Sequence, residues 1–196
     1  MARSDDLYTL PADLPVPTDD GACRHLPGLP LPSLALPATS GRMVNLADVP
    51  GWVVIYIYPR TGQPHQDPPA GWNAIPGARG CTPQACAFRD HYQSLRRLGA
   101  QVFGLSAQTP DYQREAVGRL HLPYELLSDP ALAFAARLHL PTFQIAGMTL
   151  YQRVTLIARA GYIETVFYPV FPPDKNAEAV LAWLGEQQDR SDGASL

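Results

Sequence analysis

The apolar positions of the chain fall into runs that predict alternating strands and helices. The run from Trp52 to Tyr58 is β-branched, aromatic and nearly all apolar, and it ends at Pro59. A strand that is apolar throughout, without alternating polar positions, is typical of a sheet whose two faces are both covered. A second strand is predicted over residues 101–106, and Leu126-Leu127 indicates a short third one. Apolar positions at helical spacing predict helices between Thr82 and Gly99 and over residues 112–120, 131–138 and 177–187.

The last strands are expected to form an antiparallel hairpin. Residues 153–158 and 162–167 flank Ala160-Gly161, which is a turn signal. Parallel crossovers followed by a hairpin and a final helix predict a mixed central sheet with helices on its faces. The fold class is therefore α/β, and the sequence shows neither an internal repeat nor a second domain.

Two segments are predicted to be irregular. Residues 1 to about 40 carry seven prolines, which remove too many N–H donors for a central strand or a long helix. We expect a Pro-rich N-terminal arm whose leucines pack on the domain. Residues 60–80 form a Gly- and Pro-rich loop longer than compact domains usually contain. We assign residues 1–25 to an N-terminal extension, 26–188 to one domain and 189–196 to a C-terminal tail.

Composition narrows the class of protein. The 196 residues are 46% hydrophobic and 17% charged, with a formal net charge of -3. No run of about 18 apolar residues is present for a membrane helix, and no basic cluster is longer than Arg96-Arg97. We therefore expect no membrane and no nucleic acid among the partners. The first residues lack the apolar stretch of a secretory signal, so we expect a cytoplasmic protein.

The candidate chemistry lies in the cysteines. Three cysteines without an export signal do not suggest a secreted disulfide framework, and in a reducing compartment they indicate reactive thiols or metal ligands. Cys81 falls at the predicted first turn of a helix, where unpaired N–H groups and the helix dipole favour the thiolate. Arg79 and Arg89 add positive charge nearby. We therefore predict a nucleophilic sulfur at Cys81 rather than an inert buried one.

A metal site is the weaker interpretation of these residues. Cys81, Cys86 and His91 form a C-x4-C-x4-H set. Zinc ligands are usually more closely spaced, and the sequence offers no obvious fourth ligand. We expect neither a metal nor another cofactor.

Several short motifs together resemble those of a known family. They are Tyr58-Pro59 after an apolar strand, Gly80-Cys81-Thr82, Cys86, Phe88-Arg89-Asp90, Leu127-Ser128-Asp129-Pro130 and Arg153-Val154-Thr155-Leu156. Over about residues 26 to 187 the chain resembles a peroxiredoxin of the Q type, also called bacterioferritin co-migratory protein. The resemblance implies a thioredoxin-like fold and the thiol-dependent reduction of hydrogen peroxide and organic hydroperoxides.

The resemblance also implies roles for individual residues. Cys81 would be the peroxidatic cysteine, Cys86 the resolving cysteine and Arg153 the active-site arginine, and a dithiol such as thioredoxin would reduce the Cys81–Cys86 disulfide. Residues five apart on an intact helix are separated by about 7.5 Å along the axis and about 140° around it, so the first turn must unwind. Cys23 in the arm is a rival resolving residue or a spectator.

The loop before Cys81 departs from the family pattern. Members have a hydroxyl residue three positions before the cysteine and a proline seven before it, whereas here Ala78 and Pro59 stand three and twenty-two before it. The loop thus holds about fifteen extra residues, which suit a lid, a partner surface or a dimer contact. Thr61 is the candidate for the missing hydroxyl. Trp72 either covers the site or anchors the loop.

Two other functions compete with that of a peroxidase. A thioredoxin-like disulfide oxidoreductase would have cysteines two residues apart and a proline directly before the facing strand, where this chain has Gln152-Arg153-Val154. A non-catalytic redox sensor or binding module stays open, because a Cys81–Cys86 disulfide can also signal through unwinding of the helix. The expected assembly is a monomer or a weak dimer.

Overall fold

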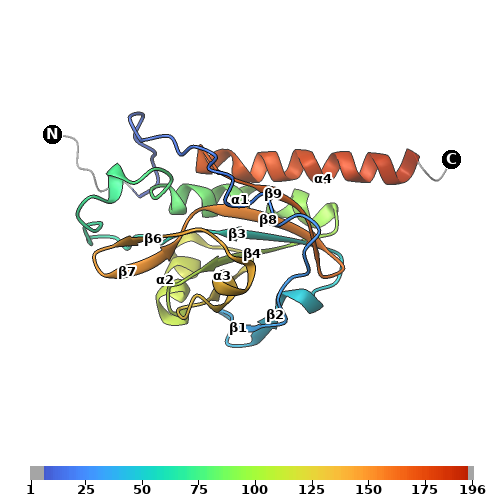
Figure 1. Ribbon diagram of the computed structural model, residues 1–196, viewed down its shortest axis with the longest axis horizontal. Helices are drawn as coiled ribbons and strands as arrows, with labels where there is room; N and C mark the ends of the chain where they lie inside the picture. Colours follow the sequence, from blue (N-terminus) through green and yellow to red (C-terminus); the bar gives the residue numbers. More distant parts are fainter. Residues whose placement is uncertain (1–6, 194–196) are drawn as a thin grey trace.

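A five-stranded mixed sheet forms the centre of the protein. The structure, a computed structural model, describes residues 7–193 and the side chains of residues 7–190. The strand order is β5-β4-β3-β8-β9, with β3, β4 and β5 parallel and β8 antiparallel to both of its neighbours (Figure 1). Their bounds are β3 Trp52–Ile57, β4 Ala100–Ser106, β5 Glu125–Ser128, β8 Val154–Arg159 and β9 Tyr162–Phe167.

Helices and apolar clusters cover both faces of this sheet. Along β3, Val54 and Tyr56 point to one face, where α1 (Cys81–Arg97), α2 (Pro110–Leu120) and α4 (Asn176–Gly193) pack. Val53 and Ile55 point to the other face, where α3 (Ala133–Leu138) and the hairpin of β1 (Ala35–Pro37) and β2 (Met43–Asn45) pack. Figure 1 shows α1 and α4 on one side of the sheet and β1 and β2 on the other. The predicted α/β, thioredoxin-like sheet is therefore confirmed.

The structure also contains elements that the pattern did not predict. These are the β1–β2 hairpin, the hairpin of β6 (Thr142–Ile145) and β7 (Met148–Tyr151), and the 3₁₀ turns η1 (Leu46–Asp48), η2 (Trp72–Ala74) and η3 (Pro173–Lys175). The missed strands have three or four residues, of which only one or two are buried, so they show no long buried apolar run. Helix α4 extends to Gly193, so residues 189–193 of the expected tail are helical, and residues 194–196 lie outside the described part.

One part of the described N-terminal arm lies against β9. Residues 7–34 contain neither a helix nor a strand, apart from an isolated bridge between Pro30 and Tyr162. The Gly28 N–H donates to Ile163 O at 2.7 Å, and the Ile163 N–H donates to Leu29 O at 2.9 Å. Residues 1–6 of the expected arm lie outside the described residues.

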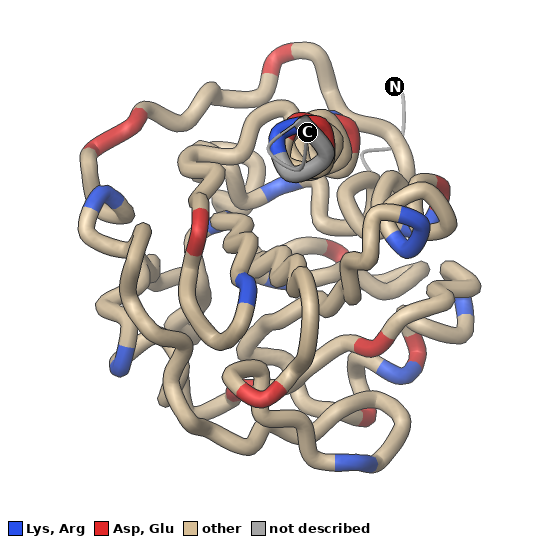
Figure 2. The backbone as a smooth tube through the Cα atoms, turned by 90° about the vertical axis from the view of Figure 1, so that its right-hand side faces the viewer, with Lys and Arg blue, Asp and Glu red and all other residues tan. Residues whose placement is uncertain are grey.

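The charged residues are dispersed. Figure 2 shows lysine and arginine interspersed with aspartate and glutamate along the backbone, without a long stretch of either sign. Within residues 7–193, no helix combines the length and apolar character that crossing a bilayer requires.

Candidate active site

Cys81 is the first residue of α1, one position before the start expected from the sequence. The preceding Gly80 is the N-cap residue and has φ 104°, in the left-handed region that favours glycine. A Cβ at Gly80 would overlap Pro173 Cγ and lie 2.8 Å from Leu10 Cδ2. Glycine is the residue that fits this turn, and the helix begins directly after it. Cys81 therefore lies at the positive end of the helix dipole, with 4% of its surface exposed.

The sheet brings Arg153 to the same place. In the antiparallel pairing of β3 and β8, Val154 stands opposite Ile57 at the end of β3 from which the loop to Cys81 departs. Arg153 directly precedes Val154, and its Nη2 lies 3.1 Å from Cys81 Sγ. As a thiol, the sulfur donates to Ala78 O over 3.6 Å; as a thiolate, it accepts from Arg153.

The Arg153 guanidinium is buried without a carboxylate. It donates to the carbonyl oxygens of Gly77, Ala78 and Arg79, each at 3.2 Å, and to Gln84 Oε1. Arg153 is 4% exposed, and within the described residues no acidic group forms an ion pair with it. A buried cation is costly unless a negative charge lies beside it. The Cys81 thiolate is the group positioned to supply that charge.

Two amide side chains help to fix the orientation of the Arg153 guanidinium. Gln84 on α1 accepts from Arg153, and its Nε2 donates to Asn176 Oδ1 at 3.0 Å. The Thr155 hydroxyl donates to the same Asn176 oxygen at 2.7 Å. This chain of contacts joins α1, β8 and α4, so the orientation of the guanidinium depends on three elements. Sequence reasoning missed Gln84 and Asn176, since nothing in their spacing distinguishes them from surface amides.

A cavity of about 280 Å³ opens at Cys81. Cys81 and Thr82 contribute the start of α1, and most of the remaining wall comes from the long loop. The lining residues are Leu7, Arg60, Gly62, Gln63, His65, Gln66, Asp67, Pro68, Pro69, Trp72, Arg79, Gly80, Cys81 and Thr82. The extra residues of the loop therefore build the entrance to the sulfur.

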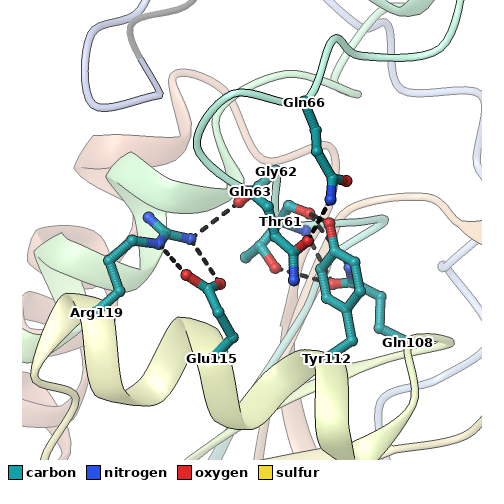
Figure 3. Close-up of polar contacts among 8 residues, drawn as sticks. All are labelled: Thr61, Gly62, Gln63, Gln66, Gln108, Tyr112, Glu115 and Arg119. Atoms are coloured by element: carbon teal, nitrogen blue, oxygen red, sulfur yellow. Dashed lines mark hydrogen bonds and ion pairs between the residues drawn. The ribbon is translucent and has the colours of Figure 1, made fainter.

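The loop is fixed to α2 and to the β6–β7 hairpin. Gln108 Oε1 accepts from both the N–H and the hydroxyl of Thr61, and the Tyr112 hydroxyl donates to Thr61 O at 3.1 Å (Figure 3). Arg119 donates to Gly62 O at 2.9 Å. At the other end, the buried Trp72 packs with Ile145 and Leu150 of the hairpin. Trp72 thus both anchors the loop and lines the cavity.

Thr61 does not stand where the sequence analysis expected it. Its hydroxyl donates to Gln108 Oε1 at 3.0 Å, and the residue is not part of the cavity wall. Thr61 therefore holds the loop, and the structure does not bring its hydroxyl to Cys81. The hydroxyl residue that does line the cavity is Thr82, next to the cysteine.

Cys86 lies five residues further along the same continuous helix. It is half-buried in a second hollow that Tyr8, Leu10 and Asp174 also line. Burial raises the pKa of the Cys86 thiol, and Arg89 opposes part of that increase. Both cysteines are free. Because α1 is continuous from Cys81 to Arg97, a disulfide between them requires its first turn to unwind.

Cys23 is separated from the site by the sheet. It belongs to the apolar cluster on the α3 face, whereas Cys81 belongs to the cluster on the α1 face. Burial, with a contribution from Asp20, raises the pKa of Cys23 to about 12. This position favours a spectator over a resolving residue.

The set Cys81, Cys86 and His91 does not form a metal centre. Within the part of the chain that the structure describes, no three His, Cys, Asp or Glu side chains are grouped so that they could hold a metal ion.

Comparison with known proteins agrees with this geometry. The redoxin family model matches residues 26–181. A chloroplastic peroxiredoxin Q of Gentiana triflora is 28% identical over 184 residues, which cover 91% of this chain and 77% of the relative. That of Populus jackii is 28% identical over 154 residues, which cover 78% of this chain and 65% of the relative.

Solved structures show the same fold. Peroxidoxin BcpB from Mycobacterium tuberculosis has a TM-score of 0.68 at 24% identity, covering 83% of this chain and 98% of its own. Peroxiredoxin Q of Xanthomonas campestris has a TM-score of 0.64 at 23% identity, covering 81% and 96%.

The chain therefore belongs to the redoxin family, and it shares the fold of solved peroxiredoxins. Within that family it is a peroxiredoxin of the Q type, an oxidoreductase with thiol-dependent peroxidase activity, as the sequence predicted.

Proposed function

We propose that this protein reduces hydrogen peroxide and organic hydroperoxides through a sulfenic acid on Cys81. The observation that carries the proposal is the buried Arg153 guanidinium, which lies 3.1 Å from the sulfur and has no carboxylate partner among the described residues. Such a cation stabilises the thiolate, which is the form of cysteine that attacks peroxides.

The first step transfers one peroxide oxygen to sulfur. The Cys81 thiolate attacks an oxygen of the O–O bond, a sulfur–oxygen bond forms, and the electron pair of the broken bond leaves with the other oxygen. A proton then converts the leaving group to water or an alcohol. Arg153 Nη2 is directed at the sulfur and donates to the oxygen that becomes bound there.

Cys86 is the proposed resolving residue. After the start of α1 unwinds, the Cys86 sulfur attacks the sulfenic sulfur, a disulfide forms and the sulfenic oxygen leaves as water. A dithiol reductant, for which we propose thioredoxin, then reduces the disulfide and is itself oxidised. The proposed setting is the cytoplasm, where such reductants keep thiols reduced.

Coupled turnover tests this function. With thioredoxin, its reductase and NADPH, the wild-type protein should consume many equivalents of hydrogen peroxide, and Cys81→Ser should consume none above background. The Cys86→Ser variant should lose the intramolecular disulfide, which mass spectrometry under non-reducing conditions detects. If the wild-type protein consumed a single equivalent and then stopped despite the reductant, a redox sensor would be the better description.

A further inference from the structure

The cavity at Cys81 is larger than hydrogen peroxide requires. Its volume is about 280 Å³. One water molecule occupies roughly 30 Å³ in the liquid, and pockets for small organic ligands begin near 300 Å³. A peroxide of two oxygen atoms would leave most of this space to water. The volume therefore suits a hydroperoxide with an organic group.

Part of the wall is apolar and rigidly held. Trp72, Pro68, Pro69 and Leu7 line it. The indole of Trp72 packs with Ile145 and Leu150, and its ring centroid lies 6.1 Å from that of Phe143. Figure 3 shows the opposite end of the loop fixed to α2 through Thr61 and Gly62. Because both ends are anchored, the apolar wall exists before a substrate arrives.

The cavity also carries an uncompensated cation. Arg60 lines it, and the partners of its guanidinium are the hydroxyl of Tyr112 at 3.3 Å and the ring of the same residue, with 5.6 Å to the centroid. Both partners are neutral, and within the described residues no carboxylate forms an ion pair with Arg60. Among the described residues, the wall contains a single carboxylate, that of Asp67, which is exposed.

We propose that the long loop makes the site selective for bulky organic hydroperoxides that carry a carboxylate. The substrate's organic group contacts Trp72, its carboxylate pairs with Arg60, and its hydroperoxide reaches Cys81. The inference rests on the proposed peroxidase function and assigns Trp72 and Arg60 as specificity determinants. A guanidinium held on an aromatic ring is well suited to this pairing, since little side-chain freedom is lost on binding.

The rates at which three peroxides oxidise Cys81 test the proposed preference for a carboxylate on the substrate. The probes are hydrogen peroxide, cumene hydroperoxide and cumene hydroperoxide with a para-carboxylate, measured by rapid quench and mass spectrometry. We expect the carboxylated probe to react about tenfold faster than the neutral aryl probe, with an advantage that shrinks as salt is added. Arg60→Gln should bring that ratio close to one, and Arg60→Lys should retain a several-fold advantage.

Matched control variants distinguish a loss of substrate binding from a general effect of changing the charge or removing an indole. Arg97→Gln makes the same change of net charge at the exposed end of α1 and should leave the ratio as in the wild type. Trp72→Ala should lower the rate for cumene hydroperoxide relative to hydrogen peroxide by about tenfold, while Trp183→Ala, which removes an indole packed edge-on against Trp52 at 5.5 Å, should not.

The outcomes that overturn the two proposals differ. If none of the three peroxides oxidises Cys81, the proposed function itself fails. If hydrogen peroxide oxidises Cys81 but the carboxylated probe is no faster than the neutral one, only the selectivity fails. The selectivity also fails if Arg60→Gln and Arg97→Gln give the same ratio of the rate with the carboxylated probe to the rate with the neutral aryl probe.

Discussion

Arg153 places five hydrogen bonds around the start of α1, including the one to Cys81 Sγ. A lysine keeps the charge but has neither the planar fork nor enough donors for this arrangement. We expect Arg153→Lys to slow Cys81 oxidation by hydrogen peroxide by about 10²-fold, the usual effect of removing one donor from a charge-stabilising site. Stopped-flow oxidation kinetics measure it.

The matched control lies at the far end of β8, the strand that Arg153 directly precedes. Arg159 ends β8 and stacks on Trp52, with its guanidinium carbon 4.8 Å from the ring centroid. Arg159→Lys should react at the wild-type rate. Equal rates for Arg153→Lys and the wild-type protein would mean that the guanidinium geometry contributes nothing to the reaction.

Gly80 sets the position of the sulfur through its backbone. At φ 104°, with Pro173 where a Cβ would stand, Gly80→Ala combines strain with overlap. We expect the free energy of unfolding to fall by about 2–3 kcal/mol, more than strain alone, together with slower Cys81 oxidation. Gly99→Ala is the control, because Gly99 has φ 76° and no atom within 4 Å of the added Cβ. Urea denaturation measures the free energy of unfolding of both variants. If both lost the same amount, the overlap with Pro173 would contribute nothing to the effect at Gly80.

The candidate catalytic residues could be predicted from the sequence, but the residues that position them could not. Cys81 stands out through its place at a helix start, and Arg153 through a family motif. Gln84 and Gln108 carry no such signal, because an amide side chain is as common on a surface as in a core. Their contacts join residues far apart in sequence, such as Gln84 with Asn176 and Gln108 with Thr61, and only the folded chain brings these together.

In the proposed mechanism helix α1 has to satisfy two requirements, since its intact first turn would activate Cys81 and its unwound form would allow Cys86 to react. Burial raises the pKa of Cys86, so this residue is a thiol at neutral pH, whereas the attacking species is the thiolate. The rate of the disulfide step should therefore rise with pH, approaching tenfold per unit below that pKa. Rapid quench of pre-formed Cys81 sulfenic acid between pH 6 and 8 measures this rate.

Arg89 provides the control for this dependence. Its charge lowers the pKa of Cys86, so Arg89→Gln should slow the disulfide step at a given pH while preserving the upward slope. A rate that does not change between pH 6 and 8 would contradict the prediction and would identify helix unwinding as the slow event.

Among the strands, those with a run of apolar residues were predicted correctly, including the four-residue β5, whereas the short strands without such a run were missed. Strands β3, β4 and β8 have six or seven residues, nearly all of them buried, and β9 was predicted from the turn signal Ala160-Gly161 that precedes it. The β6–β7 hairpin has four-residue strands with exposed positions, so no periodicity indicates it. The miss matters for function, since this hairpin supports Trp72 and thereby one wall of the cavity.

The chain that precedes the central sheet pairs with part of each of its two edges. Beside β9, the Leu31 N–H donates to Gly161 O at 2.7 Å, and beside β5, the Thr39 N–H donates to Leu126 O at 3.0 Å. Exposed edge strands invite pairing between molecules, and covering them prevents it. The sequence indicated an arm with leucines to bury, but the edge that each part covers follows only from the sheet order.

Because both edges are partly paired within the chain, we expect the protein to be a monomer in sedimentation velocity over micromolar concentrations. Leu26 and Leu31 are buried and hold the arm beside β9, whereas the Leu29 side chain is exposed. Replacing both Leu26 and Leu31 by aspartate should detach the arm and cause association through β9, and Leu29→Asp should leave a monomer. A wild-type dimer that does not dissociate on dilution would show that a surface other than the sheet edges governs assembly.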